Sequence, residues 1–310
     1  MTIAALGRSV ARMERKDNID LFGAVSLIGF SALLGLNQVV IKITNVGVQP
    51  VFQAGVRSFG AMCLLYLWMR FRGEGPNFTR RVAPWGILAG SLFAFEFILL
   101  FVALDFTTVA RSSLMFYTMP VWLAVMAHVL IPGERLTAPK IAGLACAVAG
   151  VSLALLSRDG GGGALMGDLM ALIGALGWAG IAVVAKTTPF SEDKPIMQMY
   201  WQLCTSAVIL LLASLFFGPF IREFAPVHVA TMGFQIVVMG ALGFLFWFWL
   251  LMRYPASGVA SFSFLAPIFG VGFGWLILGE PVGVSLLAAL ALVCLGLVLI
   301  NRAAQVPQKV

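Results

Sequence analysis

Charged residues are scarce in this chain. Only 11% of its 310 residues are charged and 61% are hydrophobic, whereas a soluble domain carries about 25% charged residues. The mean hydropathy is +0.99. The composition therefore excludes water as the solvent for most of the surface.

Motifs for catalysis or ATP use are also missing. The chain has only two histidines, one in each half, and none of the patterns GxSxG, HExxH or GxxxxGK[ST]. A serine hydrolase, a zinc protease and a P-loop ATPase would each need one of these. We therefore expect no enzyme activity, no catalytic residue, no metal and no cofactor. Any transport would be driven by an ion or substrate gradient, or would be passive.

Cysteine offers neither a disulfide framework nor a metal site. The four cysteines form no CxxC pair, and all lie in apolar runs, where we interpret them as small packing residues; they are Cys63, Cys146, Cys204 and Cys294. A removable signal peptide is not expected either. Residues 1–18 are polar and Arg-rich and lack a small-residue cleavage site after a short apolar segment.

Long apolar runs, by contrast, fill the chain. Runs of near 20 residues suffice to cross about 30 Å of hydrocarbon as helices, and only helices satisfy their own backbone groups in lipid without a neighbouring strand. We predict ten such runs, over residues 20–41, 50–69, 84–104, 110–131, 139–156, 167–185, 195–217, 229–251, 256–278 and 283–300. The lipid bilayer is therefore the first expected partner.

Lysine and arginine are distributed unevenly among the loops between these runs. If successive loops lie on alternate sides of the membrane, most of these residues share the side of the two chain ends. The positive-inside rule places that side in the cytoplasm. The net charge of +7 thus reflects topology, and nucleic acid is not an expected partner.

The sequence contains two related halves. QPVFQAGVRSF (49–59) aligns with KPIMQMYWQLC (194–204), and LIPGERLTAPKIAGL (130–144) aligns with LILGEPVGVSLLAAL (276–290). Each half holds five runs. Because five is odd, the second half must enter the membrane in the opposite orientation, an arrangement characteristic of secondary transporters. The alignment pairs Lys42 with Lys186, Arg57 with Gln202, Pro120 with Pro267 and Glu134 with Glu280.

We therefore predict an all-α integral membrane protein of ten transmembrane helices, built as two inverted five-helix repeats. The four consecutive glycines between the halves predict a flexible linker. The predicted units are a cytoplasmic N-terminal tail (1–19), a first repeat (20–156), a Gly-rich linker (157–166), a second repeat (167–301) and a cytoplasmic C-terminal tail (302–310).

Two short motifs recur in register in the two halves. YTMP (117–120) precedes GER (133–135), and FLAP (264–267) precedes GEP (279–281). With ten runs and an arginine in the second run, the sequence resembles the drug/metabolite transporter superfamily, EamA type, over about residues 20–301. The resemblance implies a small-metabolite carrier of the bacterial inner membrane, often an exporter of amino acids or their derivatives.

The resemblance also implies a central cavity between runs 1–4 and 6–9, with runs 5 and 10 at the periphery. One feature departs from the family pattern. Relatives often have a tryptophan in run 1 just before G-x-N, where this chain has Leu34, while the second half keeps Trp178. The cavity wall contributed by run 1 is therefore expected to differ from that of relatives.

Two opposite charges fall inside the apolar runs. Arg57 lies in run 2 and Glu96 in run 3, at matching depth on adjacent antiparallel helices. A charge at the bilayer centre costs from about 3 to 17 kcal/mol and marks a functional site by default. In one interpretation the two form a structural ion pair. In the other, Glu96 exchanges a proton or binds a cationic group, and Arg57 binds a carboxylate or tunes Glu96.

Other candidates are weaker. Polar side chains that need partners in lipid are expected to face the cavity, and aromatic side chains could stack on a substrate or simply pack. Prolines in runs 4 and 9 are candidate helix kinks. Acids of the GE motifs are expected to cap the N-termini of runs 5 and 10. These residues are Asn37, Gln38, Gln202, Tyr117, Trp178, Pro120, Pro267, Glu134 and Glu280.

The leading hypothesis is a secondary transporter that works by alternating access. Its expected partners are the bilayer, a small-molecule substrate and a proton or other coupling ion, and a homo-oligomer is a further possibility. The alternatives are an intramembrane enzyme, which would need a nucleophile–base pair or a metal at membrane depth, and a non-transporting scaffold or receptor.

Overall fold

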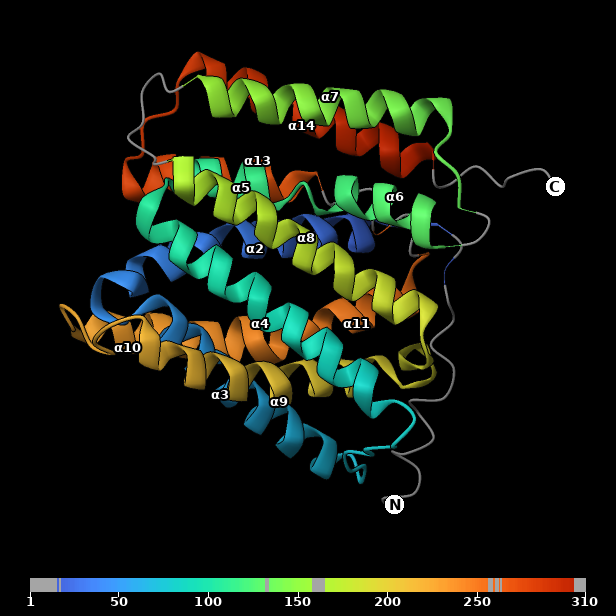
Figure 1. The fold of residues 1–310 in the computed structure, drawn as a ribbon, viewed down its shortest axis with the longest axis vertical. Coiled ribbons are helices and arrows are strands. Elements are labelled where there is room, and N and C mark those ends of the chain that lie inside the picture. Colours follow the sequence, from blue (N-terminus) through green and yellow to red (C-terminus); the bar gives the residue numbers. More distant parts are fainter. Residues whose placement is uncertain are drawn as a thin grey trace.

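The computed structural model describes residues 16, 18–131, 134–157, 165–255, 259, 262 and 264–303. The predicted linker residues 158–164 and most of both predicted tails lie outside these residues. The described chain forms a single helical bundle (Figure 1). Its principal helices are α2 (Leu21–Gly47), α3 (Pro50–Phe71), α4 (Ala83–Phe106), α5 (Val109–Phe116), α6 (Met119–Leu130), α7 (Ala138–Leu156), α8 (Leu165–Thr187), α9 (Pro195–Ala213), α10 (Pro226–Gly233), η3 (Phe234–Gly243), α11 (Phe244–Arg253), α13 (Leu265–Leu278) and α14 (Val284–Ala303).

The predicted all-α membrane fold is confirmed. In the described chain, nine helical stretches are long and apolar enough to cross a membrane. The tenth, α13, has 14 residues and is shorter than the predicted run 256–278, part of which is not described. We call the side of the bundle where α2 begins and α14 ends the terminal side, and the other the opposite side.

Two of the spans are irregular. The fourth is divided between α5 and α6, which are separated at Tyr117 and Thr118. Pro120 is the second residue of α6, where its missing N–H group costs no helical hydrogen bond. The eighth span runs through α10, η3 and α11, and its middle part, η3, is a ten-residue π-helix. π-Helices are rare and occur mostly as single-turn bulges, which are frequently found at functional sites.

The two halves pack with pairwise correspondence. Helices α3 and α9, the second spans of each half, pack together, and so do the fifth spans α7 and α14. The first span of each half packs on the fourth of the other, α2 against α13 and α8 against α6. These matched contacts are what a two-fold relation between two repeats produces.

Helices α7 and α14 lie side by side at one edge of the bundle (Figure 1). Glycines allow their backbones to come close. A Cβ atom on Gly143 would lie 2.7 Å from the Gly296 carbonyl oxygen, and one on Gly296 would lie 2.6 Å from the Gly143 oxygen. The predicted peripheral position of the fifth and tenth spans therefore matches the structure.

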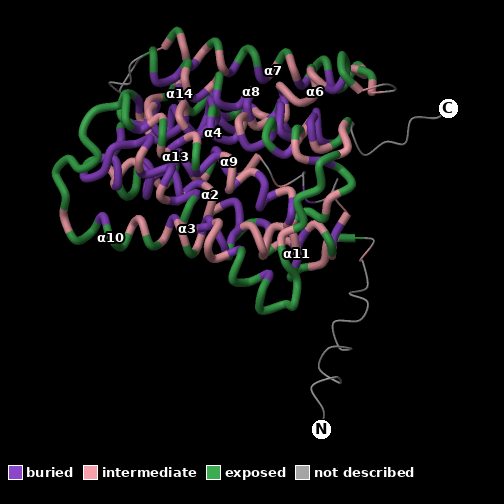
Figure 2. The backbone as a smooth tube through the Cα atoms, turned by 60° about the horizontal axis from the view of Figure 1, so that its bottom comes forward, coloured by how far each residue is buried: buried purple, intermediate pink, exposed green. Residues whose placement is uncertain are grey.

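The burial pattern is that of a protein in lipid. Buried residues concentrate in the middle of the bundle and exposed ones at its rim (Figure 2). Many exposed positions on the helices carry large apolar side chains, such as Val148, Val208 and Trp275. Such a surface is unfavourable in water and favourable in hydrocarbon. The chain is therefore a multi-pass membrane protein.

Candidate functional site

Five polar and aromatic side chains converge near the middle of the bundle. We call them the central cluster; they are Gln38 (α2), Arg57 (α3), Glu96 (α4), Tyr117 (between α5 and α6) and Trp178 (α8). Four come from the first half and Trp178 from the second. All of them were candidates from the sequence alone.

Arg57 is a buried cation held by aromatic rings. Its side chain is only 5% exposed. The guanidinium carbon lies 4.6 Å from the centre of the Phe97 ring and 5.8 Å from that of Phe101. Cation–π contacts of this kind are worth about 2 kcal/mol when desolvated. Since no described residue accepts a hydrogen bond from Arg57, its five N–H donors are left for a ligand or water.

Glu96 lies beside Arg57 without joining it. The two charges interact electrostatically, but no hydrogen bond or ion pair within 4.0 Å links these two described side chains. Glu96 is 4% exposed, and its Oε2 atom has no hydrogen-bond partner among the described residues. A glycine in α8 makes room for it, because a Cβ atom on Gly177 would lie 3.2 Å from the Glu96 Cβ.

Aromatic rings close one side of the cluster. The Trp178 ring stacks on Phe116 at 5.3 Å between centres and meets the Tyr117 ring edge-on at 6.2 Å. Tyr117 follows the end of α5, at the break in this span, and lies close enough to Glu96 and Arg57 to interact with both electrostatically. The Gln38 amide lies near the Tyr117 hydroxyl. Neither polar atom of that amide has a partner among the described residues.

The remaining sequence candidates are placed differently. Asn37 is buried in α2, and its Oδ1 atom has no partner in the described chain. In the described part of the chain, the amide nitrogen of Gln202 donates within its own helix α9, to the Gln198 carbonyl at 3.3 Å. Pro267 is the third residue of α13. Among the described residues, no hydrogen bond joins Gln202 to the charges of the central cluster.

The central cluster is chemically incomplete. Buried polar groups in folded proteins normally have hydrogen-bond partners, and unpartnered ones cost about 1–3 kcal/mol each. Here a cation, a carboxylate and an amide lie together with open hydrogen-bonding capacity. A small molecule that carries both a negative and a positive group would satisfy them.

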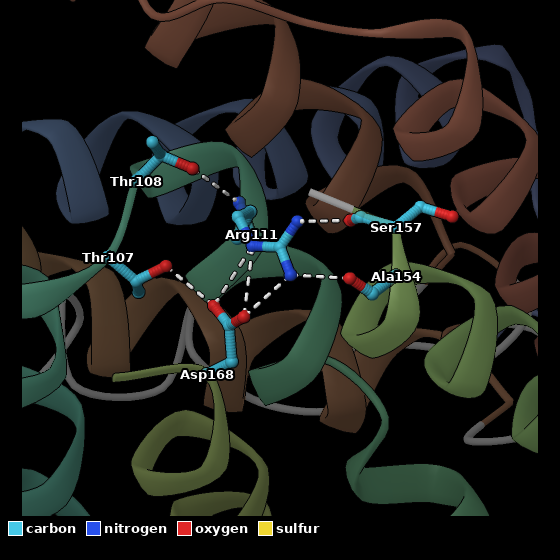
Figure 3. Close-up of polar contacts among 6 residues, drawn as sticks. All are labelled: Thr107, Thr108, Arg111, Ala154, Ser157 and Asp168. Carbon is cyan, nitrogen blue, oxygen red and sulfur yellow. Dashed lines mark hydrogen bonds and ion pairs between the residues drawn. The ribbon is translucent and has the colours of Figure 1, made fainter. Parts of the chain in front are cut away.

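A second set of polar residues lies on the opposite side, and its main pair was not among the candidates from the sequence. Arg111 of α5 and Asp168 of α8 form a buried ion pair with an N–O distance of 2.6 Å (Figure 3). Thr107 donates to Asp168 at 2.6 Å, and Arg111 also donates to the carbonyls of Ala154 and Ser157. This network joins the two halves. Neither Arg111 nor Asp168 lies deep enough in an apolar run to stand out in the sequence.

The expected roles of the GE acids were wrong. Glu280 does not cap the tenth span. Its carboxylate accepts hydrogen bonds from the backbone N–H groups of Val109 and Ala110, at 2.8 and 3.0 Å, and so caps α5 in the other half. The Glu134 carboxylate caps no helix of the described chain; its partner is Lys140, at 3.3 Å. The sequence shows that each acid precedes a helix. It does not show which helix or side chain the carboxylate contacts.

Comparison with known proteins identifies the family. The model of the EamA-like transporter family matches residues 21–156 and again residues 165–302. The chain belongs to the EamA-like transporter family. The predicted resemblance is thereby confirmed, and a transporter is the family's described role.

Several bacterial relatives are similar along the chain. An uncharacterized transporter, YoaV of Bacillus subtilis, is 25% identical over 88% of this chain and 94% of its own length. A probable amino-acid metabolite efflux pump of Escherichia coli is 26% identical over 86% and 89%. The aromatic amino acid exporter YddG of Ancylobacter novellus is 31% identical, over 45% of this chain and 49% of its own.

One solved crystal structure shares the fold. It superposes with a TM-score of 0.63 over 91% of this chain and 99% of its own, at 21% sequence identity.

Proposed function

We propose that this protein exports amino acids or related compounds across the bacterial inner membrane by alternating access. One observation carries the proposal: Arg57 and Glu96 are both buried near the middle of the bundle, close to each other, and neither is neutralised by an ion pair with the other. An intramembrane charge without a pairing partner marks a substrate or ion pathway.

The central cluster offers complementary groups for an amino acid. Arg57 would bind the substrate carboxylate, because its guanidinium can donate two parallel hydrogen bonds. Glu96 would bind the ammonium group or exchange a proton with the substrate or a coupling ion. Gln38 would supply an amide contact, and Tyr117 and Trp178 would contact the side chain. The E. coli and A. novellus relatives, whose names refer to amino acids, support this substrate class.

Orientation in the membrane and the two-repeat architecture are part of the proposed mechanism. Arginines and lysines are concentrated in the loops of the terminal side, so we place that side and both chain ends in the cytoplasm. The two repeats, over 20–156 and 167–301, would then rock against each other around the central cluster. Such inverted repeats hold their substrate near the midplane in many secondary transporters.

The test is counterflow in proteoliposomes. Vesicles preloaded with an unlabelled amino-acid mixture should take up labelled amino acids faster than empty vesicles, and Glu96→Gln should abolish that uptake. The exposed acid Glu223 provides a matched control, since Glu223→Gln makes the same chemical change far from the central cluster. Absence of exchange for every amino acid tested, with folded protein confirmed, would refute the proposed function.

A further inference from the structure

Lys42, Glu280 and the start of α5 form a tight contact on the opposite side, between the two halves. The Lys42 ammonium lies 3.1 Å from Glu280 Oε1 and donates to the Thr107 carbonyl at 2.6 Å. Glu280 also accepts the Val109 and Ala110 N–H groups. Its side chain is 7% exposed. Hydrogen bonds to an ionised carboxylate are about twice as strong as neutral ones.

The end of α13 is shaped to deliver this carboxylate. Gly279 follows α13 in the left-handed conformation, at φ 65°, which favours glycine and turns the chain toward α5. Gly274 leaves the space that the carboxylate occupies, because a Cβ atom there would lie 2.6 Å from Glu280 Oε2. The contact therefore depends on two glycines of the second half and on α2 and α5 of the first.

We call the residues that align with Lys42 and Glu280 in the other repeat their mates. In the described structure these mates form no ion pair with each other. Lys186, the mate of Lys42, is exposed at the end of α8, and no described residue forms a hydrogen bond or ion pair with it. Glu134, the mate of Glu280, has a side chain that is 40% exposed and pairs with Lys140. Two related repeats thus place the same lysine and glutamate in two different arrangements, engaged on the opposite side and separated on the terminal side.

We infer that the engaged set is a latch that holds the opposite side shut, and that Glu134 and Lys186 form its counterpart when the terminal side shuts. The inference rests on the proposed alternating access and names the residues that carry it. In an inverted repeat the two closed states are related by the same pseudo-two-fold axis. A contact made in one half of the cycle must then be broken while its mate forms.

The inference predicts different effects for two chemically identical substitutions, because only one of them opens the opposite side. Glu280→Gln removes the charge that Lys42 and the two N–H groups bind, so it should destabilise the state seen here and open the opposite side. Glu134→Gln removes a charge that this state does not use for closure. It should therefore leave the opposite side as closed as before or favour its closure. A purely structural role for Glu280 would lower stability without this asymmetry.

The experiment measures access to a buried position behind the latch. Ser113 of α5 is fully buried against Gly270 of α13, so Ser113→Cys reports separation of these helices. In a variant without the four native cysteines, intact cells would be treated with a membrane-impermeant maleimide. Glu223→Cys, an exposed position on the opposite side, establishes that the reagent reaches that side.

We expect Glu280→Gln to raise the labelling rate of Ser113→Cys about tenfold, which corresponds to about 1.4 kcal/mol in the closing equilibrium. Lys42→Gln removes the ion pair and the hydrogen bond to the Thr107 carbonyl, but it leaves Glu280 bonded to the two N–H groups of α5. It should therefore raise the rate less, and it serves as the second variant if Glu280→Gln is not inserted. Glu223→Gln is the matched control and should change nothing. Unchanged labelling in Glu280→Gln and Lys42→Gln, or an equal rise in Glu134→Gln, would overturn the inference.

Labelling needs no substrate, so its outcome is independent of the counterflow assay. Faster labelling in Glu280→Gln combined with no amino-acid exchange would support the latch and refute the proposed substrate. Amino-acid exchange combined with unchanged labelling would support the proposed function and refute the latch.

Discussion

The buried pair of Arg111 and Asp168 makes a sharp prediction about stability. Their side chains are 6% and 0% exposed, and the pair joins α5 in the first half to α8 in the second. Removing one partner of a buried ion pair leaves an uncompensated charge and costs about 3–5 kcal/mol. We expect Asp168→Asn to lower the free energy of unfolding by that amount, although the amide oxygen can still accept from Thr107.

The measurement is unfolding by SDS in mixed micelles, followed by tryptophan fluorescence. Replacing both charges by apolar residues, Arg111→Met with Asp168→Leu, should cost clearly less than Asp168→Asn alone, because the double variant does not leave Arg111 as a buried cation without its partner. The exposed pair of Lys194 and Glu74, at 3.1 Å, is the control, and Lys194→Met should cost at most about 1 kcal/mol. A loss below about 1 kcal/mol in Asp168→Asn, or additive losses in the double variant, would refute the reasoning.

Three further predictions concern the cluster, the peripheral helices and the terminal side. Arg57→Gln should abolish counterflow as Glu96→Gln does while the protein still elutes as a folded species; normal counterflow in either variant would exclude substrate binding by that residue. Gly143→Ala should separate α7 from α14 and cost about 1–3 kcal/mol of unfolding free energy; an unchanged SDS midpoint would contradict this. The pKa of Asp20 is lowered by hydrogen bonds from Lys16, the Gly23 N–H group and the Tyr254 hydroxyl. A carboxyl group with a lowered pKa stabilises the folded protein above about pH 4, and this stability is lost as the pH falls further. The melting temperature of Asp20→Asn should therefore lie below that of the parent protein at pH 7 and approach it in acid. A difference in melting temperature that does not change with pH would contradict this assignment.

Much of the architecture follows from the sequence because lipid imposes strong constraints. Apolar length predicts the spans, and an odd number of spans per repeat predicts the inversion. The depth of Arg57 and Glu96 follows from counting residues along antiparallel helices, and the structure places the two charges close together. Counting residues does not give the rotation of each helix about its own axis. In the structure this rotation places Arg57 over the Phe97 ring and not in an ion pair with Glu96.

The contacts between the halves were harder to predict. Arg111 and Asp168 are 57 residues apart and both lie near the ends of helices, where charges usually face water. Glu280 precedes α14, so local rules assign it to that helix. Its actual targets, Val109 and Ala110, come from the other half. Such pairings depend on how the two halves dock, which no local pattern records.

The capping of α5 by Glu280 has a consequence for biosynthesis. The carboxylate that satisfies Val109 belongs to a residue made 171 positions later. At about 5–20 residues per second, the ribosome needs roughly 10–30 s to reach it. During that interval water or lipid headgroups must solvate the N–H groups of Val109 and Ala110 and the ammonium of Lys42. The first repeat therefore reaches its mature form only when the second has been made.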